Sequence, residues 1–145
     1  TGPGQFNTPH GIAVAGSPPR VFVSDRGNRR IQVFDVNGKF LEEWPDIAPH
    51  SMMASSDDHI WAVDSLTDRI VKYDLSGHIE YSFGQFGTRP GYTWAMHQIS
   101  ADQDGNLYIA EVFGGRSQKY RPKPGADPTK LVWGRSLMPM TGAGN

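Results

Sequence analysis

The stretch Pro9-His10-Gly11-Ile12-Ala13-Val14 begins a pattern that recurs along the chain. It is followed by two short stretches rich in β-branched and aromatic residues, 21–25 and 30–35. Two further copies begin at His50 and His97, so successive histidines are separated by 40 and 47 positions. A repeat of about 40–50 residues made of short strands is typical of a β-propeller blade. The sequence therefore predicts an all-β chain with a β-propeller fold.

Each copy of the pattern predicts four strands, separated by turns rich in Gly, Pro, Asn and Asp. The predicted strands are 11–15, 20–25, 30–35 and 40–44 in the first copy, 51–55, 59–64, 69–74 and 79–83 in the second, and 98–101, 106–111, 116–121 and 130–133 in the third. The predicted organisation is a lead-in at 1–9, blade 1 at 10–47, blade 2 at 48–83, blade 3 with longer loops at 84–133 and a tail at 134–145.

The number of blades raises the question of ring closure, because propellers typically have about 4–8 blades and this chain predicts three. Two copies of the chain can combine into a six-bladed ring, or a longer chain can supply the missing half. An open arc is disfavoured, because its exposed strand edges would invite pairing with other chains.

The composition excludes several classes of function. The 14 basic and 15 acidic residues nearly balance, which argues against a strong electrostatic grip on nucleic acid. No apolar run approaches the roughly 18 residues that predict a membrane span. The absence of cysteine excludes thiol nucleophiles and cysteine-ligated metals. The compartment stays open, with secretion or a periplasmic location among the alternatives.

The motif Pro9–Val14, together with Val-Ser-Asp-Arg-Gly-Asn-Arg-Arg-Ile-Gln-Val-Phe-Asp at 23–35, resembles the NHL-repeat propellers. The resemblance covers roughly residues 4–133 and implies three four-stranded NHL-type blades, half of a six-bladed ring. NHL propellers include lyases, RNA binders and protein-interaction scaffolds, so the fold alone does not give the function.

Within this group, the chain resembles the bacterial relatives of peptidyl-α-hydroxyglycine α-amidating lyase, a six-bladed propeller with a catalytic zinc on its axis. This resemblance implies that His10, His50 and His97 are metal ligands and that Arg26 binds or activates the substrate. The zinc ligands of the lyase come from alternate blades, whereas these histidines stand on three consecutive ones. The resemblance therefore implies a further ligand from a partner copy or from a missing half.

The three histidines also form a constellation in their own right. Each stands at the mouth of an inner strand, and the rotational symmetry of a propeller brings such positions together near the axis. Three neutral imidazoles with an open fourth position make a catalytic zinc site. The alternative is that each histidine only completes its blade by hydrogen bonding to the backbone.

Charged residues at repeated positions have a structural interpretation. An acid ends each second strand and an arginine begins each third strand, which predicts a charge pair in every blade: Asp25 with Arg30, Asp64 with Arg69, and Glu111 with Arg116. Arg26 and Arg29 are additional, and a guanidinium in this loop suits an anionic ligand.

Three functional hypotheses follow, and the near-neutral charge counts against one of them, which is RNA binding as in some NHL propellers. The first is a scaffold that binds a protein, a peptide or a small molecule at the channel mouth. The alternative is a zinc-dependent lyase of the peptidyl-α-hydroxyglycine amidating type.

Overall fold

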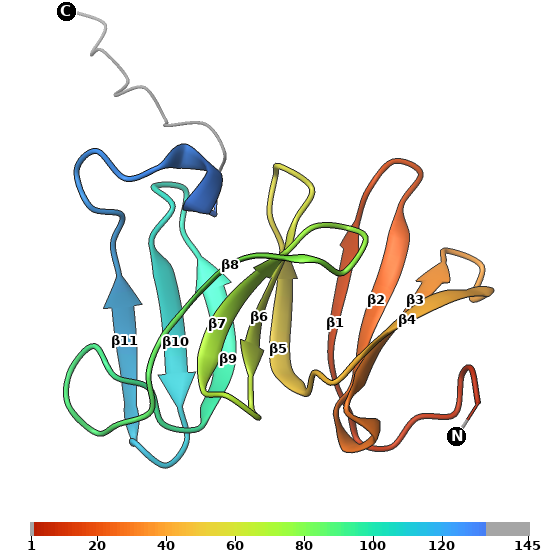
Figure 1. Cartoon of the computed structure of the whole chain (residues 1–145), viewed down its shortest axis with the longest axis horizontal. Coiled ribbons are helices and arrows are strands. Elements are labelled where there is room, and N and C mark those ends of the chain that lie inside the picture. The colour runs from red at the N-terminus through yellow and green to blue at the C-terminus, as the bar shows by residue number, and fades with distance from the viewer. Residues whose placement is uncertain (1, 133–145) are drawn as a thin grey trace, which may run out of the picture.

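The structure is a computed structural model that describes residues 2–132. Its strands form three antiparallel sheets, which stand side by side as blades (Figure 1). Blade 1 contains β1 (Pro9–Ala15), β2 (Arg20–Asp25), β3 (Arg30–Asp35) and β4 (Phe40–Pro45). Blade 2 contains β5 (Pro49–Ala54), β6 (Ile60–Asp64), β7 (Arg69–Tyr73) and β8 (Ile79–Phe83). Blade 3 contains β9 (Met96–Ala101), β10 (Leu107–Glu111) and β11 (Arg116–Tyr120).

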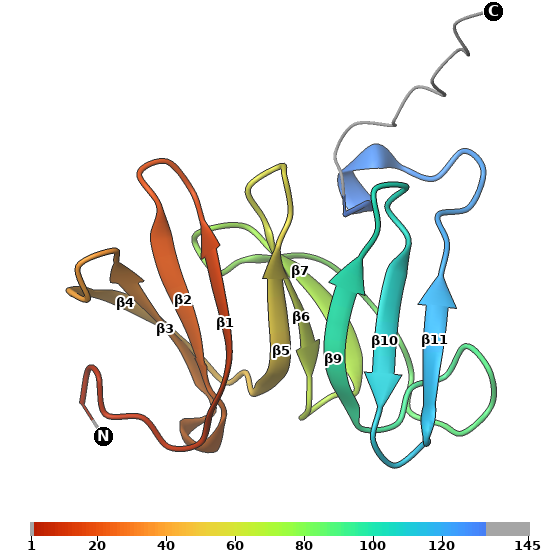
Figure 2. The same cartoon turned by 180° about the vertical axis from the view of Figure 1, so that it is seen from behind.

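Consecutive strands pair within each blade, so each sheet is a meander. The inner strands β1, β5 and β9 lie next to one another, as the view from behind shows (Figure 2). The prediction of an all-β propeller is confirmed. The predicted bounds of β2, β3 and β8 agree with the structure to the residue.

The inner strands differ from the prediction at their first residues. They begin at Pro9, Pro49 and Met96, so that each strand includes its histidine. The histidines therefore belong to the sheets and do not lie in the loops that precede them.

The predicted fourth strand of blade 3, at 130–133, is not present in its described part. Residues Pro128–Lys130 form a short 3-10 helix, η2, whose first turn is capped by the Asp127 carboxylate. The Lys72 ammonium of blade 2 binds the carbonyl oxygens of Thr129 and Leu131 at 2.9 and 3.3 Å. These bonds hold the segment against blade 2, so blade 3 has three strands among residues 2–132. Trp133 and the predicted tail 134–145 lie outside the described residues.

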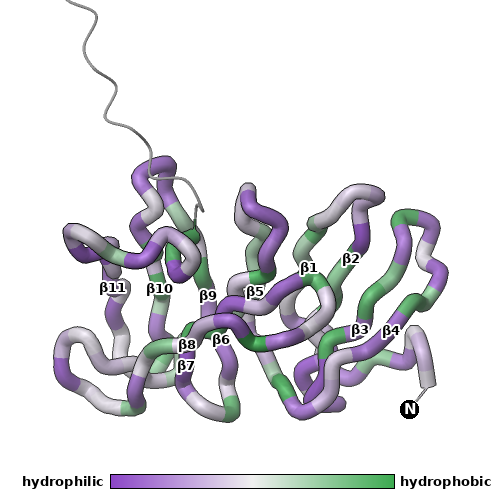
Figure 3. The backbone as a smooth tube through the Cα atoms, turned by 45° about the horizontal axis from the view of Figure 1, so that its top comes forward, coloured by the Kyte–Doolittle hydropathy of each residue, from purple (hydrophilic) through white to green (hydrophobic). Residues whose placement is uncertain are grey.

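Two apolar cores fill the spaces between neighbouring blades. One joins blades 1 and 2 around Phe22, and the other joins blades 2 and 3 around Trp61. Both residues stand at the same position of their repeats, in β2 and β6, and are no more than 1% exposed. Phe22 faces blade 2 and Trp61 faces blade 3. Tyr108 occupies the same position in blade 3 and points away from blade 2, and it is 39% exposed. Hydrophobic residues concentrate in the strands, and the turns between them are mostly hydrophilic (Figure 3).

A short 3-10 helix, η1 (Arg26–Asn28), links β2 to β3 where a loop was expected. Its Gly27 packs directly on Asn7 of the lead-in and donates its backbone N–H to the Asn7 carbonyl at 2.8 Å. The lead-in thereby holds η1, and with it Arg26, at the mouth of blade 1. Among the described residues, no helix is both long and apolar enough to cross a membrane.

Candidate metal centre at the mouth of the blades

Each of the three histidines is the extra residue of a β-bulge. The pairing of β1 with β2 passes from Pro9 directly to Gly11, which leaves His10 without a partner. The same irregularity occurs at His50 in β5 and at His97 in β9. A bulge interrupts the alternation of a strand and redirects one side chain. Three equivalent bulges therefore turn three imidazoles toward the same place.

The close approach of the inner strands depends on Gly11. A Cβ atom at this position would lie 3.3 Å from the Met52 nitrogen and from the Ser51 Cα. Contacts this short are tighter than side chains normally make, so glycine lets β1 approach β5. The Pro-His-Gly motif therefore combines a bulged histidine with the glycine that allows the next blade to come near.

Hydrogen bonds between neighbouring blades fix two of the imidazoles. His10 Nδ1 lies 2.6 Å from the His50 carbonyl oxygen, and His50 Nδ1 lies 2.7 Å from the Met96 carbonyl oxygen. A carbonyl can only accept, so both Nδ1 atoms carry the proton and both Nε2 atoms present a lone pair. Metal-binding histidines are commonly oriented by such a bond from the second ring nitrogen.

The three side chains form one cluster. Their ring centroids are 5.0 Å apart for His10 and His50, 4.7 Å for His10 and His97, and 4.9 Å for His50 and His97. One ligand atom from each residue lies within 4.8 Å of the other two. Three consecutive blades of a single chain thus bring the predicted ligand residues together, without a residue from another copy.

Arg26 lies directly at this cluster. Its guanidinium donates to His50 Nε2 at 2.7 Å. This is the nitrogen that a metal would use, so Arg26 and a cation compete for the same lone pair. The family resemblance implies that Arg26 binds or activates the substrate, but it does not predict this direct contact with His50.

The surroundings favour neutral imidazoles. Burial lowers the pKa of His50, and the positive Arg26 and the two neighbouring imidazoles lower it further, against the opposing effect of the bond to Met96. Burial also lowers the pKa of His97, as do His10 and Arg26. Neutral imidazole is the form that binds metal. The local electrostatics therefore keep two of the three residues in the form that can act as ligands.

The donor set fits zinc with modest adjustment. Zinc–nitrogen bonds of about 2.0–2.1 Å in a tetrahedral site place ligand atoms roughly 3.3 Å apart. The present arrangement, within 4.8 Å, is looser, so the imidazoles would have to close by up to about 1.5 Å. His97 is exposed, so its side chain has room to move.

The residues of this site were recognisable from their repeat position, but their geometry was not. The bulges and the bonds to carbonyls depend on strand register and on the distance between blades. The sequence signals were the recurrence of a histidine at the start of each copy and, for Arg26, the family resemblance.

Comparison with known proteins identifies the repeat. Residues 6–34, which include His10 and Arg26, match the family model described as NHL repeat. The chain is an NHL-repeat protein. It is 49% identical over 131 residues to NHL repeat-containing protein 3 of Mus musculus and 32% identical over 132 residues to the Homo sapiens protein of that name. Each match covers 84% of this NHL-repeat chain but only 38% of the relative.

Solved structures support the propeller architecture of the NHL-repeat chain. Virginiamycin B lyase from Staphylococcus aureus superimposes with a TM-score of 0.57 at 19% sequence identity. The match covers 83% of this chain and 43% of the lyase. At this level of identity the likeness shows the fold alone.

Proposed function

We propose that this NHL-repeat propeller is a binding scaffold whose ligand docks on the face where the three histidines meet. The observation that carries the proposal is the convergence of His10, His50 and His97, with ligand atoms within 4.8 Å of one another. Concave faces with a few convergent polar groups are the usual places for ligands. The ligand class is a peptide or small molecule with an anionic group that the Arg26 guanidinium receives.

The histidines are proposed to hold a zinc ion at this face. Zinc with an open coordination position is a Lewis acid and attracts oxygen ligands. A zinc ion held here would use His50 Nε2, and the Arg26 guanidinium would then be free to receive the anionic ligand. The three histidines and Arg26 then act as two neighbouring anchors for one ligand.

Zinc binding is tested by calorimetric titration of the metal into the purified chain. We expect one zinc per chain, and we expect His97→Gln to weaken binding at least about tenfold, since a zinc ligand is removed. His97 is the most informative position because no hydrogen bond joins its side chain to another described residue. His78→Gln is the control, since His78 lies on an exposed hairpin beside Asp74. Equal zinc binding by wild type and His97→Gln would contradict the proposed site.

Substitution of Arg26 gives a second test, in which the zinc affinity should rise and not fall. Removal of the guanidinium in Arg26→Met frees His50 Nε2 and eliminates a nearby positive charge, so zinc should bind more tightly. The same variant should lose peptides that are selected on the zinc-loaded wild-type chain from a library with free carboxyl termini. Arg29→Met is the control, because Arg29 lies in the same connection and its side chain is exposed. Unchanged peptide binding by Arg26→Met would contradict the proposed anchor.

The second candidate function is the zinc-dependent lyase of the peptidyl-α-hydroxyglycine amidating type. The observation that favours it is the combination of a three-histidine cluster with a guanidinium 2.7 Å from one of its nitrogens. Turnover of a peptidyl-α-hydroxyglycine by the zinc-loaded chain, lost in Arg26→Met, would support the lyase. Peptide binding without turnover would support the scaffold.

Ring closure by a second copy is also proposed. Ile12 and Val14 on the outward face of β1 are 65% and 54% exposed, and Tyr108 on the outward face of β10 is 39% exposed. Packing blade 1 of one copy on blade 3 of another would cover these apolar residues. Light scattering should give the mass of a dimer. A monomer at micromolar concentration would contradict this proposal.

A further inference from the structure

A cavity of about 550 Å³ lies between blades 2 and 3, away from the three histidines. Its walls are Tyr81 and Phe83 of β8, Tyr120 of β11, and the connection that runs from β11 to η2. Cavities of roughly 300–1,000 Å³ are the size that accepts small molecules. The cavity exists because this connection crosses to blade 2 and does not continue along β11.

The apolar part of the cavity is aromatic. The rings of Tyr81 and Phe83 stack with centroids 5.7 Å apart, and Phe83 meets Tyr120 edge-on at 5.6 Å. All three side chains are only partly buried, so they keep surface available for contact. A flat aromatic ligand would extend this series of ring contacts.

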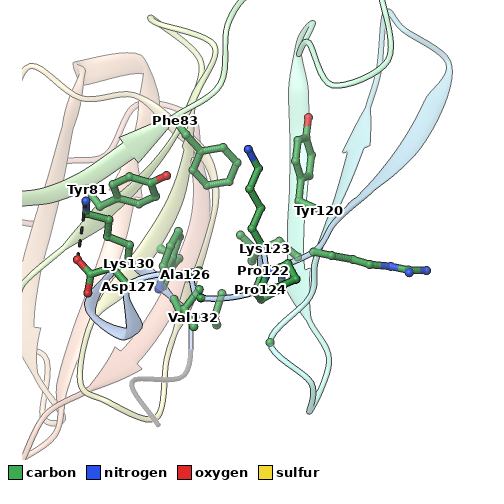
Figure 4. Close-up of a pocket in the computed structure, with 16 residues that line it drawn as sticks. Tyr81, Phe83, Tyr120, Pro122, Lys123, Pro124, Ala126, Asp127, Lys130 and Val132 are labelled. Carbon is green, nitrogen blue, oxygen red and sulfur yellow. Dashed lines mark ion pairs between the residues drawn. The ribbon is translucent and has the colours of Figure 1, made fainter. Parts of the chain in front are cut away.

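The charged part of the cavity is predominantly positive. Its lining includes the cations Arg121, Lys123 and Lys130 and one acid, Asp127. Lys130 is engaged already, with Asp127 at 3.8 Å and the Tyr81 ring at 5.8 Å. Within residues 2–132, no ion pair or hydrogen bond involves the Lys123 ammonium. Figure 4 shows the Lys123 side chain extending toward the space between Phe83 and Tyr120.

The cavity is also lined by Trp61, which belongs to the core between blades 2 and 3. Its indole Nε1–H is buried and has no hydrogen-bond acceptor in the described part of the chain. This nitrogen has no surface open to the cavity, so the cavity gains no donor from it. The unpaired Lys123 ammonium is therefore the group that indicates a ligand with an acidic group.

We infer that this cavity binds a small aromatic anion, with the ligand ring against Phe83 and Tyr120 and its acidic group at Lys123. The aromatic walls supply contact area, and the positive lining selects the charge. The inference is independent of the zinc proposal, because none of the three histidines lines the cavity.

The experiment uses two probes that share one aromatic frame. The first is 8-anilinonaphthalene-1-sulfonate and the second is N-phenyl-1-naphthylamine, which lacks the sulfonate. Fluorescence titration of the full chain should show one saturable site for the sulfonate. Lys123→Met should weaken binding of the sulfonate about fivefold, the value of one partly exposed charge-assisted contact, and should leave the neutral probe unaffected.

Two further variants complete the test. Phe83→Leu should weaken both probes, because it removes a ring wall without removing charge. Lys39→Met, in an exposed turn of blade 1, should change neither. Equal loss of both probes in Lys123→Met, or sulfonate binding that Lys123→Met leaves unchanged, would overturn the inference. Binding without saturation would overturn it as well.

Discussion

Blades 1 and 3 differ from blade 2 in how they use the same acidic and basic repeat positions. In blade 1, Arg30 donates to the buried Asp25 at 2.8 Å, and Gln32 donates to the same carboxylate at 3.0 Å. In blade 3, Arg116 donates to Glu111 at 3.2 Å, and Gln118 also donates to Glu111. The expected pair of acid and arginine is confirmed in these two blades.

Blade 2 lacks this arrangement. Asp64 accepts hydrogen bonds from the Ala48 backbone at 3.1 Å and from the Thr67 hydroxyl at 2.7 Å. Arg69 turns to Ser82 instead, at 3.1 Å. The predicted pair is therefore wrong for blade 2, although Asp64 and Arg69 are cross-strand neighbours.

The difference between the blades corresponds to a difference in the segments that lead into them. Arg30 donates to the carbonyls of Gly2 and Gln5, which belong to the lead-in of blade 1. Arg116 and Gln118 both donate to the Tyr92 carbonyl, in the long segment that enters blade 3. Blade 2 is entered by a short connection, and Val71 stands where the other blades have glutamine. In blades 1 and 3, an arginine and a glutamine two positions apart thus bind the segment that leads into the blade.

The network of blade 1 also supports the candidate metal centre. The lead-in that Asp25, Arg30 and Gln32 hold also holds η1, through the bond from Gly27 to Asn7. Arg26 is part of η1. The network of blade 1 therefore fixes the position of the guanidinium that contacts His50.

The largest effect is expected for Arg30→Met. The Asp25 side chain is fully buried, and without Arg30 it keeps a charge that its remaining donors compensate only in part. Breaking a buried pair from one side typically costs about 3–5 kcal/mol. Urea unfolding should show this loss of unfolding free energy. A change below about 1 kcal/mol would mean that the network of blade 1 does not stabilise the fold.

A smaller loss is expected for Arg116→Met. Its partner Glu111 is buried, but the Arg116 side chain is 24% exposed and Gln118 continues to donate to the carboxylate. Removal of one charge-assisted hydrogen bond costs about 2 kcal/mol. The same urea experiment measures it. A loss equal to that of Arg30→Met would show that exposure does not distinguish the two blades.

Acid should weaken blade 1 through Asp25. Burial alone raises the pKa of this carboxyl, but hydrogen bonds from Asn7, Asn28, Arg30 and Gln32 outweigh burial and lower it. The folded pKa is therefore below the unfolded value of about 3.9, so the carboxylate stabilises the fold above that pH. Its contribution is lost as the pH falls through the folded value. Unfolding free energies measured between pH 7 and pH 2 should decline less steeply in Asp25→Asn than in the wild type.

The smallest effect is expected for Arg69→Met, the matched substitution in blade 2. Arg69 is exposed, and among residues 2–132 its side chain donates only to Ser82 at the surface. Surface substitutions usually change stability by less than about 0.5 kcal/mol. A loss comparable to that of Arg116→Met would contradict the distinction between the blades.

The fold could be predicted because its signal is repeated. Three copies with the same spacing of strands and turns identify the propeller, and they placed β2, β3 and β8 to the residue. The missing strand of blade 3 could not be predicted, because Lys72 of another blade binds the carbonyls of that segment. Such a bond depends on the packing of blades, which no local pattern shows.

The clustering of the three histidines could be predicted from the sequence, whereas the geometry of the cluster could not. The recurrence of His10, His50 and His97 pointed to a common place near the axis. The family resemblance implied that a further zinc ligand would come from a partner copy or a missing half. The reason was that the zinc ligands of the lyase stand on alternate blades, whereas these histidines stand on consecutive ones. Bulges at the three histidines and the close approach at Gly11 bring consecutive blades within reach of one another.

The proposed zinc site is tested most directly by anomalous diffraction at the zinc edge on crystals of the zinc-loaded chain. We predict a single peak with a nitrogen of His10, of His50 and of His97 each at about 2.0–2.1 Å, and with the Arg26 guanidinium moved off His50. A peak that touches one histidine, or no peak at the cluster, would contradict the proposed metal centre.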